Sequence, residues 1–187
     1  LQSCEKGVKS MGDTVLLVVD MQTALIQGHP YHEKKLITNI AHLISMCRKK
    51  KIEIVYVRHD GGVGDELEYN SAGWQIYKEI KPRDGEKIFE KRYNSAFKST
   101  GLKQYLDEKK IKNIILVGMQ TEYCIDTTCK VAFEYGYHII IPEGSTSTYD
   151  NSFATGESLN NFYMHNVWKD RFAKILSISE LEKIKGE

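Results

Sequence analysis

Two kinds of hydrophobic pattern alternate along the chain. Residues 14–20 (TVLLVVD) form a continuous, β-branched apolar run that ends in a carboxylate, which is typical of a strand buried on both faces of a parallel sheet. Residues 34–50 instead carry apolar side chains at helical spacing, and residues 52–57 (IEIVYV) form a second apolar run. The first part of the chain therefore predicts a β-α-β unit.

A second such unit is predicted further along, where residues 113–118 (NIILVG) and 138–141 (HIII) are strand-like and residues 121–135 are helix-like. Gly136 is placed as the stop of that helix. Three further elements are predicted: a short strand at 87–89, a helix at 155–171 and a last strand near 175–178. Because parallel neighbours need crossover connections, this alternation predicts an α/β fold with a mostly parallel, doubly wound sheet and helices on both faces.

The chain is long enough for one domain with its own core. Its 187 residues lie within the usual range of about 100 to 200 residues per domain. We expect residues 1–12 to be a tail or an expression remnant and residues 13–187 to be a single domain. The connection between residues 60 and 90 is rich in glycine and contains Trp74 and Tyr77. Connections of this length are often functional, so we expect this one to form a wall of a site.

Charge and cysteine content narrow the class of partner. Lys plus Arg (26) and Asp plus Glu (25) give a formal net charge of +1, so no overall field attracts nucleic acid or acidic membranes. No apolar run approaches the ~20 residues of a membrane helix, and the first ten residues contain no apolar secretion-signal core. The four cysteines form no Cys-x-x-Cys pair. We expect a cytoplasmic protein that acts on a small molecule and has neither nucleic acid nor a membrane as partner.

Three polar residues follow predicted strands, where α/β sheets bind their ligands. Asp20 ends the first strand directly after five apolar residues, and Lys91 follows the short third strand. Cys124 comes after a buried strand and three residues after Thr121, a possible helix N-cap, so the positive helix end would favour its thiolate. Taken singly, each residue has an ordinary alternative: a capping carboxylate, a solvated lysine or a small core cysteine.

Three segments taken together resemble the isochorismatase-like cysteine hydrolases. They are VVDMQ at 18–22, K-R-x-x-S-A-F at 91–97 and G-x-x-T-x-x-C-[VI]-x-x-T at 118–128. The resemblance covers residues 14–181 and includes the order and spacing of the three motifs. It implies a Rossmann-like sheet of six strands in the order 3-2-1-4-5-6, and it implies a homodimer or a larger homo-oligomer.

The same resemblance implies how the site is built. Asp20, Lys91 and Cys124 would form a catalytic triad, the Met119–Gln120 peptide bond would be cis, and the backbone amides of Gln120 and Cys124 would form an oxyanion hole. The implied activity is hydrolysis of a C–N bond in a small amide, ureido or carbamoyl compound, through a thiolate nucleophile and a covalent acyl-enzyme. The helix end and the Lys91 charge would bring the pKa of Cys124 below the free value of about 8.5, whereas the nearby Asp20 carboxylate would raise it, and the sequence does not fix the balance.

Three other functions remain open. An isochorismatase-type vinyl-ether hydrolase would not need the cysteine, a non-catalytic relative would serve as an oligomeric binding or scaffold protein, and a flavodoxin-like module would bind a nucleotide. We expect no cofactor and no metal, because the Asp-x-His-x-x-x-His motif of nicotinamidases is reduced here to one histidine, His59. The spacing of His29 and His32 could suit a metal, but a pair of loop histidines is more often solvated.

The walls of a substrate pocket can be assigned only as candidates. Five residues lie on segments close to the predicted strand ends: Gln22, Trp74, Tyr93, Tyr123 and Tyr149. The aromatic members would suit a small planar ligand. We interpret Cys47 and Cys129, which lie within predicted helices, as packing residues.

Overall fold

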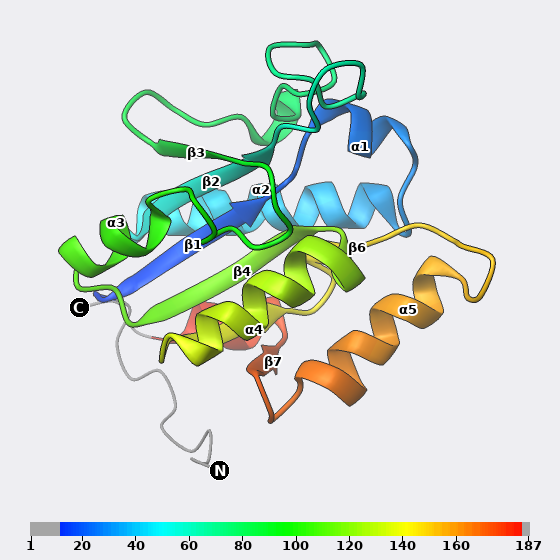
Figure 1. Cartoon of the computed structure of the whole chain (residues 1–187). Helices are drawn as coiled ribbons and strands as arrows, with labels where there is room; N and C mark the ends of the chain where they lie inside the picture. Colours follow the sequence, from blue (N-terminus) through cyan, green and yellow to red (C-terminus); the bar gives the residue numbers. More distant parts are fainter. Residues whose placement is uncertain (1–11, 185–187) are drawn as a thin grey trace.

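The structure is a computed structural model that describes residues 12–184, so all but the last residue of the predicted tail lies outside the described residues. One sheet runs through the protein, and every strand pairing in it is parallel (Figure 1). Its strands are β1 (Thr14–Val19), β2 (Glu53–His59), β3 (Lys87–Lys91), β4 (Asn113–Met119), β5 (His138–Pro142), β6 (Thr146–Ser147) and β7 (Ala173–Leu176). Their order is β3-β2-β1-β4-β5-β7, and the two-residue β6 pairs with β4. The predicted fold class and strand order are confirmed.

Helices cover both faces of the sheet: α2 lies on one side, and α3 and α4 lie on the other (Figure 1). The helices are α1 (Thr23–Gln27), α2 (Glu33–Lys49), α3 (Leu102–Glu108), α4 (Asp126–Glu134), α5 (Gly156–Phe162) and α6 (Ile178–Lys183). A 3₁₀ turn, η1 (Lys78–Ile80), and two π-helical segments, η2 (Thr121–Ile125) and η3 (Tyr163–Trp168), accompany them. Within residues 12–184, no helix is both long and apolar enough to cross a membrane.

Strand β1 is buried on both faces because its side chains alternate between two apolar layers. Leu16 belongs to the layer under α2, together with Ile40 of that helix. Leu17 belongs to the opposite layer, together with Leu102 of α3 and Cys129 of α4. This double burial explains why the sequence of β1 is continuously apolar up to Asp20.

The carboxyl ends of the inner strands meet at one edge of the sheet. The chain changes direction of winding between β1 and β4, which is where open α/β sheets bind ligands. In the register of the sheet, Val19 of β1 lies beside Gly118 of β4, and His59 of β2 lies beside Lys91 of β3. The residues that directly follow or end these strands are thereby brought to the same place.

The long connection after β2 is tied to the segment that follows β1. The backbone N–H groups of Thr23 and Ala24 donate to the carbonyls of Gln75 and Gly73, at 2.8 and 3.0 Å. In the opposite direction, the N–H of Tyr77 in the connection donates to Met21 O at 2.9 Å. The connection is therefore held over the edge of the sheet that bears the candidate residues.

The predicted helix at 121–135 is wrong in its first part. Residues 121–125 form the π-helical segment η2, and the α-helix begins only at Asp126. Gln120, rather than Thr121, occupies the N-cap position of η2, and Thr121 Oγ1 donates a hydrogen bond of 2.7 Å to Asn160 Oδ1. The helix predicted at 155–171 likewise begins as α5 and continues as a π-helical segment, which ends at Trp168.

The last strand was predicted two residues too late. It covers Ala173–Leu176, where Ile140 pairs with Lys174 and Ile141 pairs with Ile175. Its extension to residue 178 is prevented by a capping box that starts α6: Ser177 Oγ accepts from Glu180 N, and Ser177 N donates to the Glu180 carboxylate. Five short elements were not predicted: α1, η1, α3, β6 and α6.

Gly118 is expected to be required for the close approach of β4 to β1. Its φ is +126°, and a Cβ built there would lie 1.9 Å from Val19 O. Gly118→Ala should therefore lower the free energy of unfolding by about 1–3 kcal/mol more than Gly136→Ala does. Gly136 is a matched control, because its φ is +87° and no atom lies within 4 Å of the added Cβ. Urea unfolding of both variants measures the difference, and equal losses would contradict the expectation.

Candidate active site

Asp20 is held in a buried turn directly after β1. Its φ is +52°, and its backbone N–H donates to Val57 O at 2.8 Å, which turns the carboxylate inward rather than along the strand. The side chain is only 2% exposed, and Oδ2 lies 2.6 Å from Lys91 Nζ. The other oxygen, Oδ1, is buried without a hydrogen-bond partner among the described residues. One carboxylate oxygen is thus committed to the lysine, and the other is free to accept a proton.

Lys91, the last residue of β3, extends a fully buried side chain between the other candidate residues. Its Nζ lies 3.1 Å from Cys124 Sγ and 3.1 Å from His59 Nδ1, in addition to the ion pair with Asp20. Burial on its own would lower the pKa of Lys91, but the negative charge of Asp20 and its hydrogen bond to the ammonium outweigh burial and raise the pKa. The side chain is therefore a buried ammonium at neutral pH.

Cys124 lies in η2, where its thiol is half-buried and reaches Asn94 Oδ1 at 3.9 Å. Burial, followed by the negative charge of Asp20, raises the pKa of this thiol to about 12, and Lys91 offsets only part of the increase. Burial and the Asp20 charge therefore outweigh the helix end and the Lys91 charge, and the pKa lies above the free value. The helix-dipole contribution was expected from an α-helical first turn, whereas Cys124 lies in a π-helical segment. In the resting site the sulfur is a thiol beside an ion pair.

The turn before Cys124 contains the predicted oxyanion-hole residues. The Met119–Gln120 peptide bond is cis. The carbonyl oxygen of Gln120 accepts from the N–H groups of Tyr123 and Ile125, at 3.2 and 3.1 Å. These bonds hold the two sides of η2 around Cys124. The roles of the Gln120 and Cys124 amides remain a prediction.

His59 and Asn94 are contacts of the site that the sequence analysis did not assign to it. His59 ends β2, is half-buried and has its Nδ1 at the Lys91 ammonium. Burial and then the positive charge of Lys91 lower the pKa of His59, so its ring is neutral at neutral pH. The available signal was its position as the last residue of a strand beside the strand that ends in Lys91.

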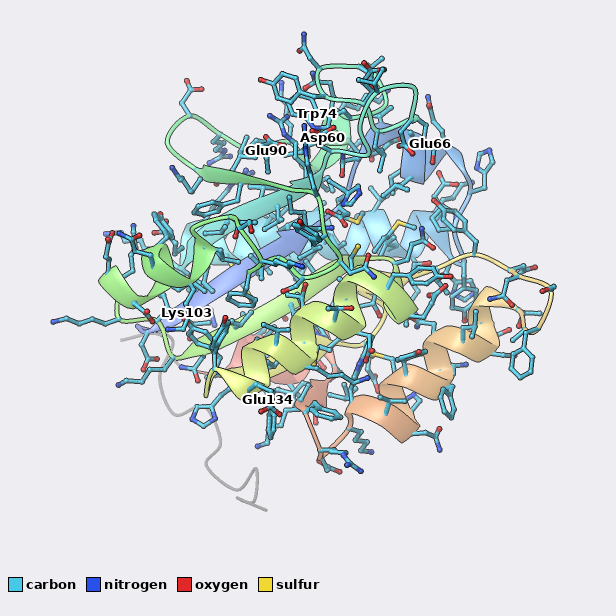
Figure 2. The ribbon with its side chains drawn as sticks, in the orientation of Figure 1. Asp60, Glu66, Trp74, Glu90, Lys103 and Glu134 are labelled. Atoms are coloured by element: carbon cyan, nitrogen blue, oxygen red, sulfur yellow. The ribbon has the colours of Figure 1, made fainter. Side chains whose placement is uncertain are left out.

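The five candidate pocket residues divide into two groups. Three of them already make contacts within the protein. Gln22 bonds to His59 and Trp74, and the Arg58 guanidinium lies 3.3 Å from the centre of the Trp74 ring. Tyr149 donates to Leu25 O at 2.5 Å. Tyr93 and Tyr123 are about half exposed, at 47% and 51%. Figure 2 shows Trp74 and Asp60 in the upper part of the molecule, away from Lys103 and Glu134.

The histidines considered as metal ligands have other contacts. His29 pairs with Glu33 at 2.8 Å, the ring of His32 stacks on Tyr31, and His59 accepts from Lys91. Across the described part of the chain, no three His, Cys, Asp or Glu side chains converge in a way that could hold a metal ion.

Cys124 is expected to react with iodoacetamide at least about tenfold faster than Cys47 or Cys129 at neutral pH. Both of those side chains are fully buried in the core, and burial raises their pKa values as well. The Cys124 rate should keep rising well above pH 9, because its thiol remains largely protonated there. Peptide mass spectrometry identifies each modified cysteine, with Cys124→Ser as the control. Uniform labelling of the three would contradict the expectation.

A comparison with models of protein families identifies the family of the chain. Residues 14–180 match the model of the isochorismatase domain, which is most of the chain. The chain belongs to the isochorismatase family. A solved isochorismatase from Pseudomonas putida superimposes with a TM-score of 0.88 at 26% identity, covering 94% of this chain and 93% of that one.

Two proteins named for a hydrolytic activity are among the similar sequences. Streptothricin hydrolase from Streptomyces noursei is 27% identical over 137 residues, which are 72% of this chain and 50% of that protein. The chain thus spans half the length of this relative. Nicotinamidase 3 from Arabidopsis thaliana is 26% identical over 159 residues, which are 78% of each chain.

Proposed function

We propose that this isochorismatase-family protein is a cysteine hydrolase that cleaves a C–N bond in a small amide, ureido or carbamoyl compound. The supporting observation is the Lys91 ammonium, which bridges the Asp20 carboxylate and the half-buried Cys124 thiol at the carboxyl edge of the sheet. A nucleophile, a proton acceptor and a fixed positive charge are the groups that acyl transfer requires. Similarity to a nicotinamidase and to streptothricin hydrolase supports the same class.

The raised pKa of Cys124 favours attack with simultaneous loss of the thiol proton. As Sγ forms a bond to the carbonyl carbon, Asp20 accepts the proton from sulfur, and Oδ1 is the oxygen with no other partner. The carbonyl π electrons move to oxygen, where the amides of Gln120 and Cys124 would stabilise the negative charge. Asp20 then gives its proton to the leaving nitrogen as the C–N bond breaks.

A thioester between Cys124 and the acyl group remains after the amine leaves. Water attacks this thioester while Asp20 accepts one of its protons, and collapse of the tetrahedral intermediate returns the sulfur. Asp20 finally gives the proton back to the sulfur, which restores the starting site. Lys91 stays protonated throughout, so its role is to keep positive charge beside whichever of the two partners is anionic.

Release of ammonia or amine from a panel of candidate substrates tests this function. The panel contains nicotinamide, N-carbamoyl compounds, ureidoacrylate-like acids and simple primary amides. We expect turnover of at least one of them, and Cys124→Ala should lower it by at least about 10³-fold. The variant should remain folded, because loss of one sulfur leaves only a small cavity. A thermal melt checks this.

Two results would overturn the proposal. Cleavage of a vinyl ether that persists in Cys124→Ala would establish the isochorismatase-type reaction, which needs no cysteine. Failure to turn over any member of the panel, together with no acyl-Cys124 adduct in the intact mass after incubation, would favour the non-catalytic binding protein.

A further inference from the structure

The ammonium of Lys91 has three N–H donors and three partners, and the proposed reaction uses only two of them. Asp20 Oδ2 lies at 2.6 Å and Cys124 Sγ lies at 3.1 Å. The third partner is His59 Nδ1, also at 3.1 Å. A buried ammonium with every donor occupied cannot rotate freely, so the third contact determines where the other two N–H groups point.

The contact defines the protonation state of His59. An ammonium group only donates, so Nδ1 must carry a lone pair and the ring hydrogen must be on Nε2. The imidazole is neutral at neutral pH, because burial and the facing charge of Lys91 lower its pKa. Three carboxylates also face the ring, Asp20 after β1 and Asp60 and Asp65 after β2, and they oppose this shift only in part.

Two features of the fold fix the position of His59: hydrogen bonds to the Gln22 side chain and the register of the sheet. His59 N–H donates to Gln22 Oε1 at 2.8 Å, and His59 O accepts from Gln22 Nε2 at 2.9 Å. Gln22 is fully buried and lies two residues after Asp20, so it links the ends of β1 and β2. The register of the sheet sets His59 directly beside Lys91. The position of the acceptor is therefore built into the fold rather than left to a flexible side chain.

We propose that His59 is a positioning residue: its neutral Nδ1 holds one N–H of Lys91, so that the remaining two stay directed at Asp20 and Cys124. Protonation of the ring removes the acceptor and sets two cations 3.1 Å apart, which displaces the ammonium from the nucleophile. Hydrolysis is consequently lost on the acid side as His59 becomes charged. This inference rests on the proposed hydrolase function.

Two substitutions of His59 distinguish the effect of its hydrogen-bond acceptor from the effect of its flat ring. His59→Asn keeps a neutral acceptor oxygen close to the position of Nδ1 and does not titrate, whereas His59→Phe keeps a flat ring and has no acceptor. We expect His59→Phe to lower kcat at least about tenfold with little change in KM, and His59→Asn to recover most of that loss. In His59→Asn, the acid limb of the pH profile assigned to the histidine should disappear.

Two measurements do not depend on turnover, so they distinguish failure of this inference from failure of the proposed function. The rate of Cys124 alkylation at a fixed pH should be several-fold lower in His59→Phe than in the wild type, and His59→Asn should restore it. In the wild type, NMR of the imidazole should show the Nε2–H tautomer and a titration midpoint below about 6.5. The NMR result stands even if a variant does not fold.

The inference is overturned by any of three results. These are wild-type kinetics and alkylation in His59→Phe, equal defects in His59→Phe and His59→Asn, or a wild-type ring with its hydrogen on Nδ1. If no substrate is found but the alkylation and NMR results are as expected, the positioning role holds and only the proposed reaction fails.

Discussion

Asp20→Asn is expected to lower hydrolysis by about 10²- to 10⁴-fold and, at the same time, to accelerate alkylation of Cys124. The substitution keeps the shape of the side chain but removes the group that accepts the thiol proton. It also removes a negative charge that raises the pKa of Cys124, and it leaves the sulfur as the only anionic partner available to Lys91. The thiolate should therefore form at lower pH, although it can no longer complete turnover.

Opposite changes in the two rates are what separate a general base from a purely structural carboxylate. Iodoacetamide labelling and substrate turnover are measured on the same samples over a range of pH. Glu90→Gln is a matched control: Glu90 directly precedes Lys91, but its carboxylate pairs with Arg58 of β2 at 2.6 Å. It should change neither rate by more than about threefold. Slower alkylation in Asp20→Asn would show that Asp20 supports the thiolate rather than opposing it.

The inner strands could be predicted because strands buried on both faces have continuous apolar sequences. β1 and β4 are covered on both faces, so almost every side chain in them must be apolar. The last strand and α6 depend on a smaller signal. Ser177 and Glu180 have the spacing of a capping box, and this signal ends the strand before the apolar residue Ile178. The π-helical form of η2 has no comparable local signal.

The candidate site was partly predictable because residues at strand ends converge by topology alone. Asp20, Lys91 and Cys124 follow from that rule and from the family motifs. His59 does not, because its role depends on the third donor of an ammonium that reaches it across the sheet. Gln22, in contrast, was predicted as a pocket residue because it lies two residues after Asp20. Its amide group instead bonds to the backbone of His59 and Trp74.

Lys91→Met is expected to abolish hydrolysis and to lower the free energy of unfolding by about 3–5 kcal/mol, which is the usual cost of removing one member of a buried ion pair. The Lys91 side chain is fully buried, and Asp20 would be left as an unpaired charge that is 2% exposed. Lys103→Met is a matched control, because that lysine pairs with Asp107 at 2.6 Å on the surface, where both side chains remain substantially exposed. Its loss should cost less than about 1 kcal/mol.

The double variant Asp20→Asn/Lys91→Met separates stability from function. Removing both charges eliminates the unpaired ion, so denaturant unfolding should recover most of the stability lost in Lys91→Met, because a neutral pair of similar volume is often tolerated in place of a buried ion pair. Hydrolysis should stay abolished, since neither the proton acceptor nor the fixed positive charge is present. Recovery of stability without activity would mean that the ion pair is retained for chemistry rather than for folding. If the double variant were no more stable than Lys91→Met, the loss in the single variant would have to come from packing around the lysine chain.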